Sequence, residues 1–177
     1  NSYTNTTAGN NGFAAYGGWD KVTIDNCSFN SHTRASGAGN PGSQGTSRCT
    51  VSGYTDGDTY FPRFVTVQNC HFEDILNGDT GTDDNNMDSD GLKIFGGNTT
   101  GTDYIASSST VSNNVFRNCK GRSIKIQQDE STVIGNTFSR NILPIDGGFT
   151  DINMQVSSGE ASSNKFHYDE VTGTPNL

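Results

Sequence analysis

VTIDNCSF (22–29) and VTVQNCHF (65–72) are the clearest copies of a phrase that returns three more times in a weaker form. The later copies are STVSNNVF (109–116), STVIGNTF (131–138) and GEASSNKF (159–166). Each copy ends on phenylalanine and carries asparagine two or three places earlier. Successive phenylalanines are 43, 44, 22 and 28 residues apart. The shortest gap sets a unit of about 22 residues, and the longer gaps are that unit plus insertions.

A second phrase precedes the first in most units. It reads GFAAYGG (12–18), GLKIFGG (91–97), SIKIQQ (123–128) and DINMQV (151–156). Its apolar residues alternate with period two, which is typical of a half-buried strand. A repeated all-β unit with inward Ile, Val and Phe predicts a right-handed parallel β-helix of about five coils, spanning 1–177 as a single domain.

Asparagine and cysteine recur at the turn before each phenylalanine. Asparagine adopts the left-handed backbone conformation at little cost, and stacked amides can bond each other in a ladder. Cys27 and Cys70 occupy one slot of the repeat, two residues before phenylalanine. None of the four cysteines forms a CxxC pair, so we expect buried free thiols rather than a zinc site, with a disulfide left open.

Two segments are predicted to lie outside the coils. They cover 31–62 and 73–90 and are rich in Gly, Ser, Asp and Thr. Long loops on a rigid solenoid commonly carry function. A stack of five coils would also expose sheet edges at both ends, so we expect this sequence to be a fragment of a longer natural chain.

The charge of the chain bears on its partners. The formal net charge is -8 and the pI is about 4.6. Nucleic acids and anionic membranes would be repelled by such a protein, so neither is an expected partner. No apolar run approaches the length of about 20 residues that a membrane-spanning helix needs, so we expect no membrane insertion.

Alignment of the second phrase predicts which residues face outward. One outward column holds Lys93 and Lys125, and its neighbour holds Tyr16, Phe95 and Gln127. Exposed aromatic rings can stack on sugar rings, although cover by a loop or by another subunit would explain them equally well. The same comment applies, with less positional support, to Trp19, Tyr60 and Phe61.

The alignment also gathers charged residues at one place. Upstream of the outward columns, Asp90 aligns with Arg122, and Asp88 lies just before them. Together with Lys93 and Lys125 they form the densest predicted charged patch. A row of solvated ion pairs is one interpretation, and general acid and base catalysis is the other.

The segment NNMDSDGLKIFGG (85–97) resembles a calcium loop at first sight. Read from Asn86, however, the twelfth position is Gly97 where an EF-hand needs glutamate, and strands rather than helices flank it. A looser calcium site, built from acidic residues of this region, stays open. It would use Asp83, Asp84, Asp88 or Asp90. We otherwise expect no metal and no other cofactor.

The repeated phrases resemble the coils of pectate-lyase-like parallel β-helix proteins. The run NVFRNCKGRSIKIQQDESTVIGNTFSRN (114–141), with DINMQVSSGEASSNKFHYDE (151–170), is more specifically similar to bacteriophage tailspike depolymerases. That resemblance implies a homotrimer on the phage tail that binds and cleaves a bacterial surface polysaccharide, such as capsule, exopolysaccharide or O-antigen. It does not transfer catalytic residues, because tailspike carboxylates follow no fixed motif.

Three functions are compatible with this reading. The first is an endo-acting glycoside hydrolase with Asp88, Asp90 and Glu73 as candidate catalytic carboxylates. In this hypothesis the substrate is held by residues of the outward columns and the patch, namely Lys93, Phe95, Tyr16, Arg122, Lys125 and Gln127. The second is a polysaccharide lyase that acts by β-elimination on a uronic-acid polymer. The third is a carbohydrate-binding spike segment without catalysis.

Overall fold

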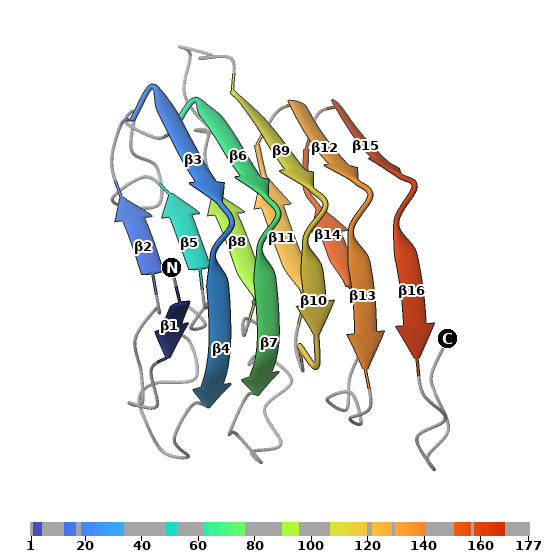
Figure 1. Ribbon diagram of the computed structural model, residues 1–177. Helices are drawn as coiled ribbons and strands as arrows, with labels where there is room; N and C mark the ends of the chain where they lie inside the picture. Colours follow the sequence, from blue (N-terminus) through green and yellow to red (C-terminus); the bar gives the residue numbers. More distant parts are fainter. Residues whose placement is uncertain are drawn as a thin grey trace, which may run out of the picture.

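The described part of the chain, in a computed structural model, consists of β-strands arranged in three parallel sheets (Figure 1). The residues that the structure describes are 2–4, 13–16, 19–33, 49–52, 62–76, 90–95, 107–119, 122–128, 130–140, 151–156 and 158–168. Within these ranges there is no helix that could cross a membrane.

The three sheets are called A, B and C. Sheet A contains β1 (Ser2–Thr4), β4 (Ser28–Thr33), β7 (His71–Leu76), β10 (Val115–Arg117), β13 (Thr137–Arg140) and β16 (Lys165–Tyr168). Sheet B contains β2 (Phe13–Tyr16), β5 (Cys49–Ser52), β8 (Leu92–Phe95), β11 (Ile124–Gln127) and β14 (Ile152–Met154). Sheet C contains β3 (Lys21–Asp25), β6 (Phe64–Gln68), β9 (Ser108–Ser112), β12 (Glu130–Ile134) and β15 (Ser158–Ser162).

Successive strands enter the three sheets in a fixed rotation. We call a rung the three strands that follow one another through sheets B, C and A, such as β2, β3 and β4. Five rungs follow in this order, and β1 precedes them in sheet A. Each strand pairs in parallel with the equivalent strand of the next rung, at the usual spacing of about 4.8 Å. The predicted all-β architecture with parallel pairing is therefore confirmed.

The predicted alignment of the second phrase is confirmed for β8 and β11. Leu92 pairs with Ile124 and Ile94 pairs with Ile126, and all four side chains are fully buried. The prediction that 31–62 lies wholly outside the repeat is wrong, because β5 forms within it and pairs with β2 and β8. Similarly, the first four residues of the 73–90 segment belong to β7.

The turn between sheets C and A requires a left-handed residue in every rung. Its φ values lie between 53° and 68°, and the residues are Asn26, Asn69, Asn113, Gly135 and Ser163. Asparagine and glycine adopt this conformation at lower cost than most residues. The backbone N–H at this position bonds the next rung, as Asn113 N does to the Ile134 carbonyl at 3.2 Å. This requirement explains one of the two recurrent asparagine positions.

The next residue is asparagine in the last three rungs, Asn114, Asn136 and Asn164, and these amides form the predicted ladder. Asn136 illustrates the bonds of this ladder. Its Oδ1 atom accepts from Asn114 N at 2.9 Å and from Asn114 Nδ2 at 3.0 Å. Asn136 Nδ2 donates to Asn164 Oδ1 at 3.1 Å and to the Val111 carbonyl at 3.0 Å. Asn114 Oδ1 in turn accepts from Cys70 N at 2.8 Å. Because Asn136 is fully buried, a lost ladder bond could not be replaced by water.

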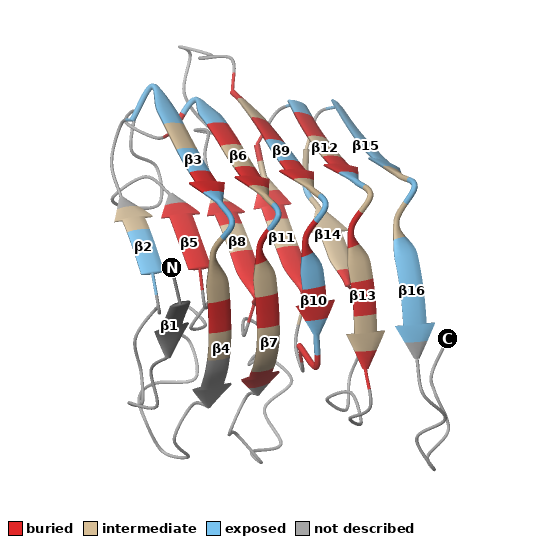
Figure 2. Cartoon of the chain, in the orientation of Figure 1, coloured by how far each residue is buried: buried red, intermediate tan, exposed pale blue. Residues whose placement is uncertain are grey.

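Five phenylalanine rings form a continuous stack beside this ladder. The ring centroids of Phe29, Phe72, Phe116, Phe138 and Phe166 are 4.8, 4.6, 5.2 and 5.0 Å apart in that order, and neighbouring planes differ by no more than 14°. The core between the sheets is continuous along the rungs, with buried positions recurring in the strands of rungs two to four (Figure 2). The last ring of the stack is exposed on β16.

All four cysteines are free thiols, as expected. Cys70 occupies the ladder slot and donates its Sγ–H to the Gln68 carbonyl at 3.1 Å. Cys27 is half-buried, whereas Cys49 and Cys119 are buried in the core. Burial raises the pKa of the Cys119 thiol to about 12, so the reactive thiolate is scarce at neutral pH. Cys49 and Cys119 therefore act as packing residues.

Asn136→Ala should destabilise the protein by about 3 kcal/mol, because it removes several bonds and leaves the buried Asn114 N–H unpaired. The matched control is Asn113→Gly, which replaces an exposed left-handed residue and should change stability by less than about 1 kcal/mol. Urea unfolding followed by circular dichroism measures both. Equal effects of the two substitutions would contradict a ladder that holds the rungs in register.

Candidate functional site

Asp90 and Arg122 form a buried ion pair rather than an exposed patch. Asp90 is 0% exposed, and its Oδ1 lies 2.6 Å from Arg122 Nε. Both residues were predicted to belong to an outward charged patch, and this prediction is wrong for Asp90. Asp90 lies two residues before the buried Leu92, so its side chain points to the same, inward side of the strand. Desolvation lowers the pKa of the Arg122 guanidinium. A carboxylate in this position stabilises the fold and is out of reach of a polymer.

A second buried pair lies at the same corner of the rungs, where the chain enters sheet B. Arg140 Nη2 contacts Asp151 Oδ1, and Ser123 Oγ donates to the same oxygen at 2.7 Å. Arg140 and Asp151 are both buried. Two such pairs at equivalent corners support a structural role for Asp90.

Sheet B presents the predicted row of cationic and aromatic residues. Lys93 and Lys125 are direct neighbours in register, and both are half-buried. Lys93 Nζ lies 5.6 Å from the centre of the Phe95 ring, which offsets part of the repulsion between the two lysines. Gln127 pairs with Phe95 and donates from Nε2 to Gln155 Oε1 at 2.6 Å. This row stays a candidate for substrate contact.

Two of the predicted site residues, Tyr16 and Asp88, lie partly or wholly outside the described residues. The backbone of Tyr16 belongs to β2 and pairs with Ser52, which in turn pairs with Phe95. One strand therefore separates the two aromatic residues that the alignment had made neighbours. The side chain of Tyr16 and the whole of Asp88 lie outside the described residues.

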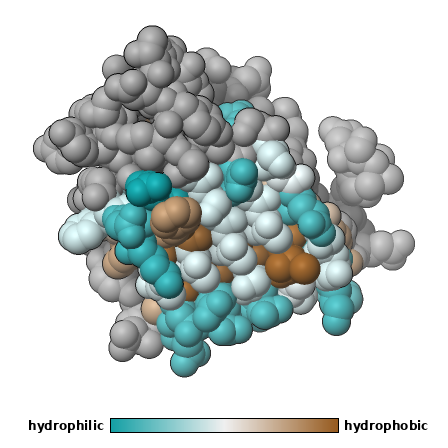
Figure 3. Space-filling view, turned by 90° about the horizontal axis from the view of Figure 1, so that it is seen from above, coloured by the Kyte–Doolittle hydropathy of each residue, from teal (hydrophilic) through white to brown (hydrophobic). Residues whose placement is uncertain are grey.

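Sheet C offers a largely polar outward surface. Thr23, Thr66, Thr110 and Thr132 follow one another in register on β3, β6, β9 and β12. Figure 3 looks down on the molecule from above, where sheet C lies in Figure 1, and hydrophobic colour is confined there to separate patches among pale and teal residues. This surface carries hydroxyl groups suited to hydrogen bonds with a polar ligand.

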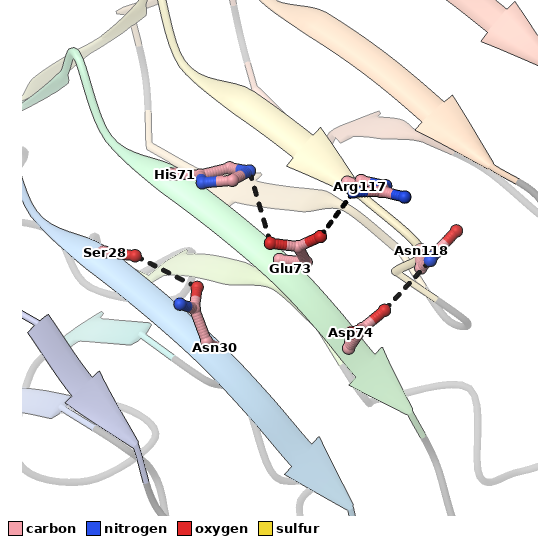
Figure 4. Close-up of polar contacts among 7 residues, drawn as sticks. All are labelled: Ser28, Asn30, His71, Glu73, Asp74, Arg117 and Asn118. Carbon is pink, nitrogen blue, oxygen red and sulfur yellow. Dashed lines mark hydrogen bonds and ion pairs between the residues drawn. The ribbon is translucent and has the colours of Figure 1, made fainter.

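Glu73 lies at the centre of a polar cluster on the outward face of sheet A (Figure 4). Its Oε1 lies 2.7 Å from Arg117 Nη1 on β10, and its Oε2 lies 3.8 Å from His71 Nε2 on the same strand. Glu73 remains 24% exposed, so a ligand can reach it. An ionised carboxylate is an acceptor only, and Arg117 restricts its position. Of the two candidate carboxylates in the described ranges, Glu73 is accessible and Asp90 is not.

The flanks of this cluster are held by bonds between and within rungs. Asn118 Nδ2 donates to Asp74 Oδ1 at 2.9 Å, and both residues have left-handed backbones with φ of 53° and 54°. On β4, Ser28 Oγ donates to Asn30 Oδ1 at 3.0 Å. The rungs therefore fix the backbone on both sides of Glu73.

The structure does not bring together Glu73 and Asp90, the two predicted catalytic carboxylates that lie in the described ranges. Glu73 belongs to sheet A, whereas Asp90 precedes β8 of sheet B and is buried. Sequence reasoning also missed His71 and Arg117. A signal for Arg117 was present, because it follows Phe116 as Glu73 follows Phe72, and the two phenylalanines had been aligned. No group of three or more His, Cys, Asp or Glu residues in the described ranges is arranged to hold a metal.

Comparisons with protein families, with curated proteins and with solved structures find no match to this chain.

Asp90→Ala should cost about 3 kcal/mol or more, because it leaves the guanidinium of Arg122 buried beside a cavity. Asp20→Ala is the matched control: Asp20 also pairs with arginine, but its side chain is 78% exposed, so the change should cost less than about 1 kcal/mol. Thermal unfolding of both variants measures the difference. A fully stable Asp90→Ala protein would contradict the structural role of this pair.

Proposed function

We propose that the chain is a right-handed parallel β-helix that binds and hydrolyses a bacterial surface polysaccharide as part of a phage tailspike. The rotation of the strands through three parallel sheets supports the β-helix. The right hand follows from the strong general preference for right-handed crossovers between parallel strands. The resemblance of the repeats to tailspike depolymerases supports the substrate class, the homotrimer and the location on the virion, outside the bacterial cell.

The observation that carries this proposal is the position of Glu73. Its carboxylate is outward, accessible and clamped by Arg117 at 2.7 Å on the neighbouring rung. A clamp of this kind reduces the motion of a reactive group before substrate arrives. The outward column of Glu73 continues with Asn30 on β4 on one side, and with Arg117 on β10 and Ser139 on β13 on the other.

In the proposed reaction, water replaces the leaving sugar at the anomeric carbon and the glycosidic oxygen takes a proton. Glu73 accepts a proton from the attacking water or stabilises the positive charge that develops on the sugar ring. The candidate for the proton donor is Asp88, which lies outside the described residues. Lys93, Phe95, Lys125 and Gln127 belong to a different sheet and would contact another part of the polymer. The proposed reaction uses no metal.

Glu73→Gln should reduce polysaccharide cleavage at least 100-fold with little loss of stability, because the amide keeps the shape but cannot accept a proton. New reducing ends and the size of the polymer measure cleavage by the full chain. Glu160→Gln is the matched control, because Glu160 is an exposed carboxylate on sheet C, and it should retain full activity.

Three results would contradict the proposal. Full activity of Glu73→Gln would exclude Glu73 as a catalytic residue. An unsaturated product that absorbs ultraviolet light would indicate a lyase. Binding without any reduction in polymer size would indicate an adhesin.

A further inference from the structure

Two large aromatic side chains are exposed where the rungs enter sheet C. Trp19 is 55% exposed and Phe64 is 41% exposed. Backbone bonds hold the two segments side by side: Arg63 N donates to the Trp19 carbonyl at 3.0 Å, and Phe64 N donates to the Asp20 carbonyl at 3.1 Å. The two rings therefore belong to adjacent rungs, and the core does not account for them.

Charged groups border these rings. The Arg63 guanidinium lies 5.2 Å from the centre of the Phe64 ring. Arg63 Nη1 also lies 3.5 Å from Asp20 Oδ1, and both side chains are largely in solvent. The site thus combines apolar rings with one strong donor and one strong acceptor. A pyranose ring has the matching chemistry, because its C–H face is apolar and its hydroxyls both donate and accept.

The charge balance favours a neutral sugar. Arg63 and Asp20 carry opposite charges, so neighbouring hydroxyls of one ring can bond to both. A carboxylated sugar would meet Asp20 and a chain whose net charge is -8.

The same rung connects this place to Glu73. Phe64 begins β6, and Glu73 lies on β7 nine residues further along the chain. An extended chain rises about 3.3 Å per residue, so the two places are up to about 30 Å apart. Thr66, Gln68 and His71 occupy the outward positions between them. A polymer of several sugars is long enough to touch both ends.

We propose that Trp19, Phe64, Arg63 and Asp20 form a second binding site, which takes neutral pyranose units of the polysaccharide that Glu73 cleaves. The identity of this ligand rests on the proposed function. The site holds the polymer far from the cleaved bond, so it contributes to the affinity for long chains and not to the chemical step.

Trp19 is the sole tryptophan of the sequence, so the intrinsic fluorescence of the protein reports on this site directly. The full chain is titrated with maltohexaose, cellohexaose, mannohexaose and, as the acidic probe, an oligogalacturonate. At least one neutral hexasaccharide should change the emission in a saturable manner, and the oligogalacturonate should not. No response to any neutral probe, or an equal response to the acidic one, overturns the proposal.

Variants test the assignment of residues. Arg63→Met and Phe64→Ala should each weaken the binding of the neutral probe at least tenfold. Ile134→Ala removes another exposed apolar side chain of sheet C and should leave the affinity unchanged. Wild-type affinity in both Arg63→Met and Phe64→Ala would overturn the assignment, as would an equal loss in Ile134→Ala. Thermal unfolding of each variant verifies that it is folded.

Glu73→Gln separates this inference from the proposed function. It should abolish cleavage while the fluorescence titration stays as in the wild type. In the active chain, Trp19→Ala should raise KM for the long polysaccharide about tenfold and leave kcat unchanged. If Glu73→Gln still cleaves, the catalytic assignment fails and the titration alone decides the second site. If the titration fails while Glu73→Gln is inactive, only the second site is lost.

Discussion

The structure depends on the in-register stacking of equivalent residues along the rungs. Parallel pairing places each residue beside its counterpart in the next rung, so every position must tolerate a neighbour of its own kind. Asparagine satisfies this condition with its amide, which donates to one rung and accepts from another. Phenylalanine satisfies it by ring stacking at 4.6 to 5.2 Å. These two columns fix the register of the rungs, and this register determines which outward side chains lie next to each other.

We therefore expect function in columns whose residues do not stabilise one another by stacking. On the outward face of sheet A, Glu73 has Asn30 on one side and Arg117 on the other, so the carboxylate is neighboured by groups that complement it. On sheet B, Lys93 and Lys125 face each other although like charges repel. We expect binding or chemistry at these columns, because the first is not self-matching and the second is self-matching but repulsive, so the fold requires neither.

Much of the fold was predictable, because the phenylalanine and asparagine columns repeat visibly in the sequence. β5 was missed because its inward positions hold Cys49 and Val51, where most other copies of the phrase carry larger apolar residues such as Leu92 and Ile94. The site was harder to predict. The alternation of inward and outward residues in β8 places Asp90 inward, but a charged residue is usually expected to be exposed. The structure shows that Asp90 is buried, because the ion pair with Arg122 compensates its charge. The outward column of Glu73 changes residue type from rung to rung, so Glu73 was found without His71 and Arg117.

The assignment of Glu73 as the reactive carboxylate can be tested by a double variant, Glu73→Arg with Arg117→Glu, in which the two charges of the ion pair are exchanged. Because the residues are neighbours in register, the exchanged pair can re-form the ion pair and keep the stability of the fold, while the carboxylate moves by one rung, about 4.8 Å. We predict an unfolding temperature close to that of the wild type and a loss of polysaccharide cleavage of at least 100-fold. Wild-type cleavage by the exchanged protein would contradict the assignment of Glu73 as the reactive carboxylate.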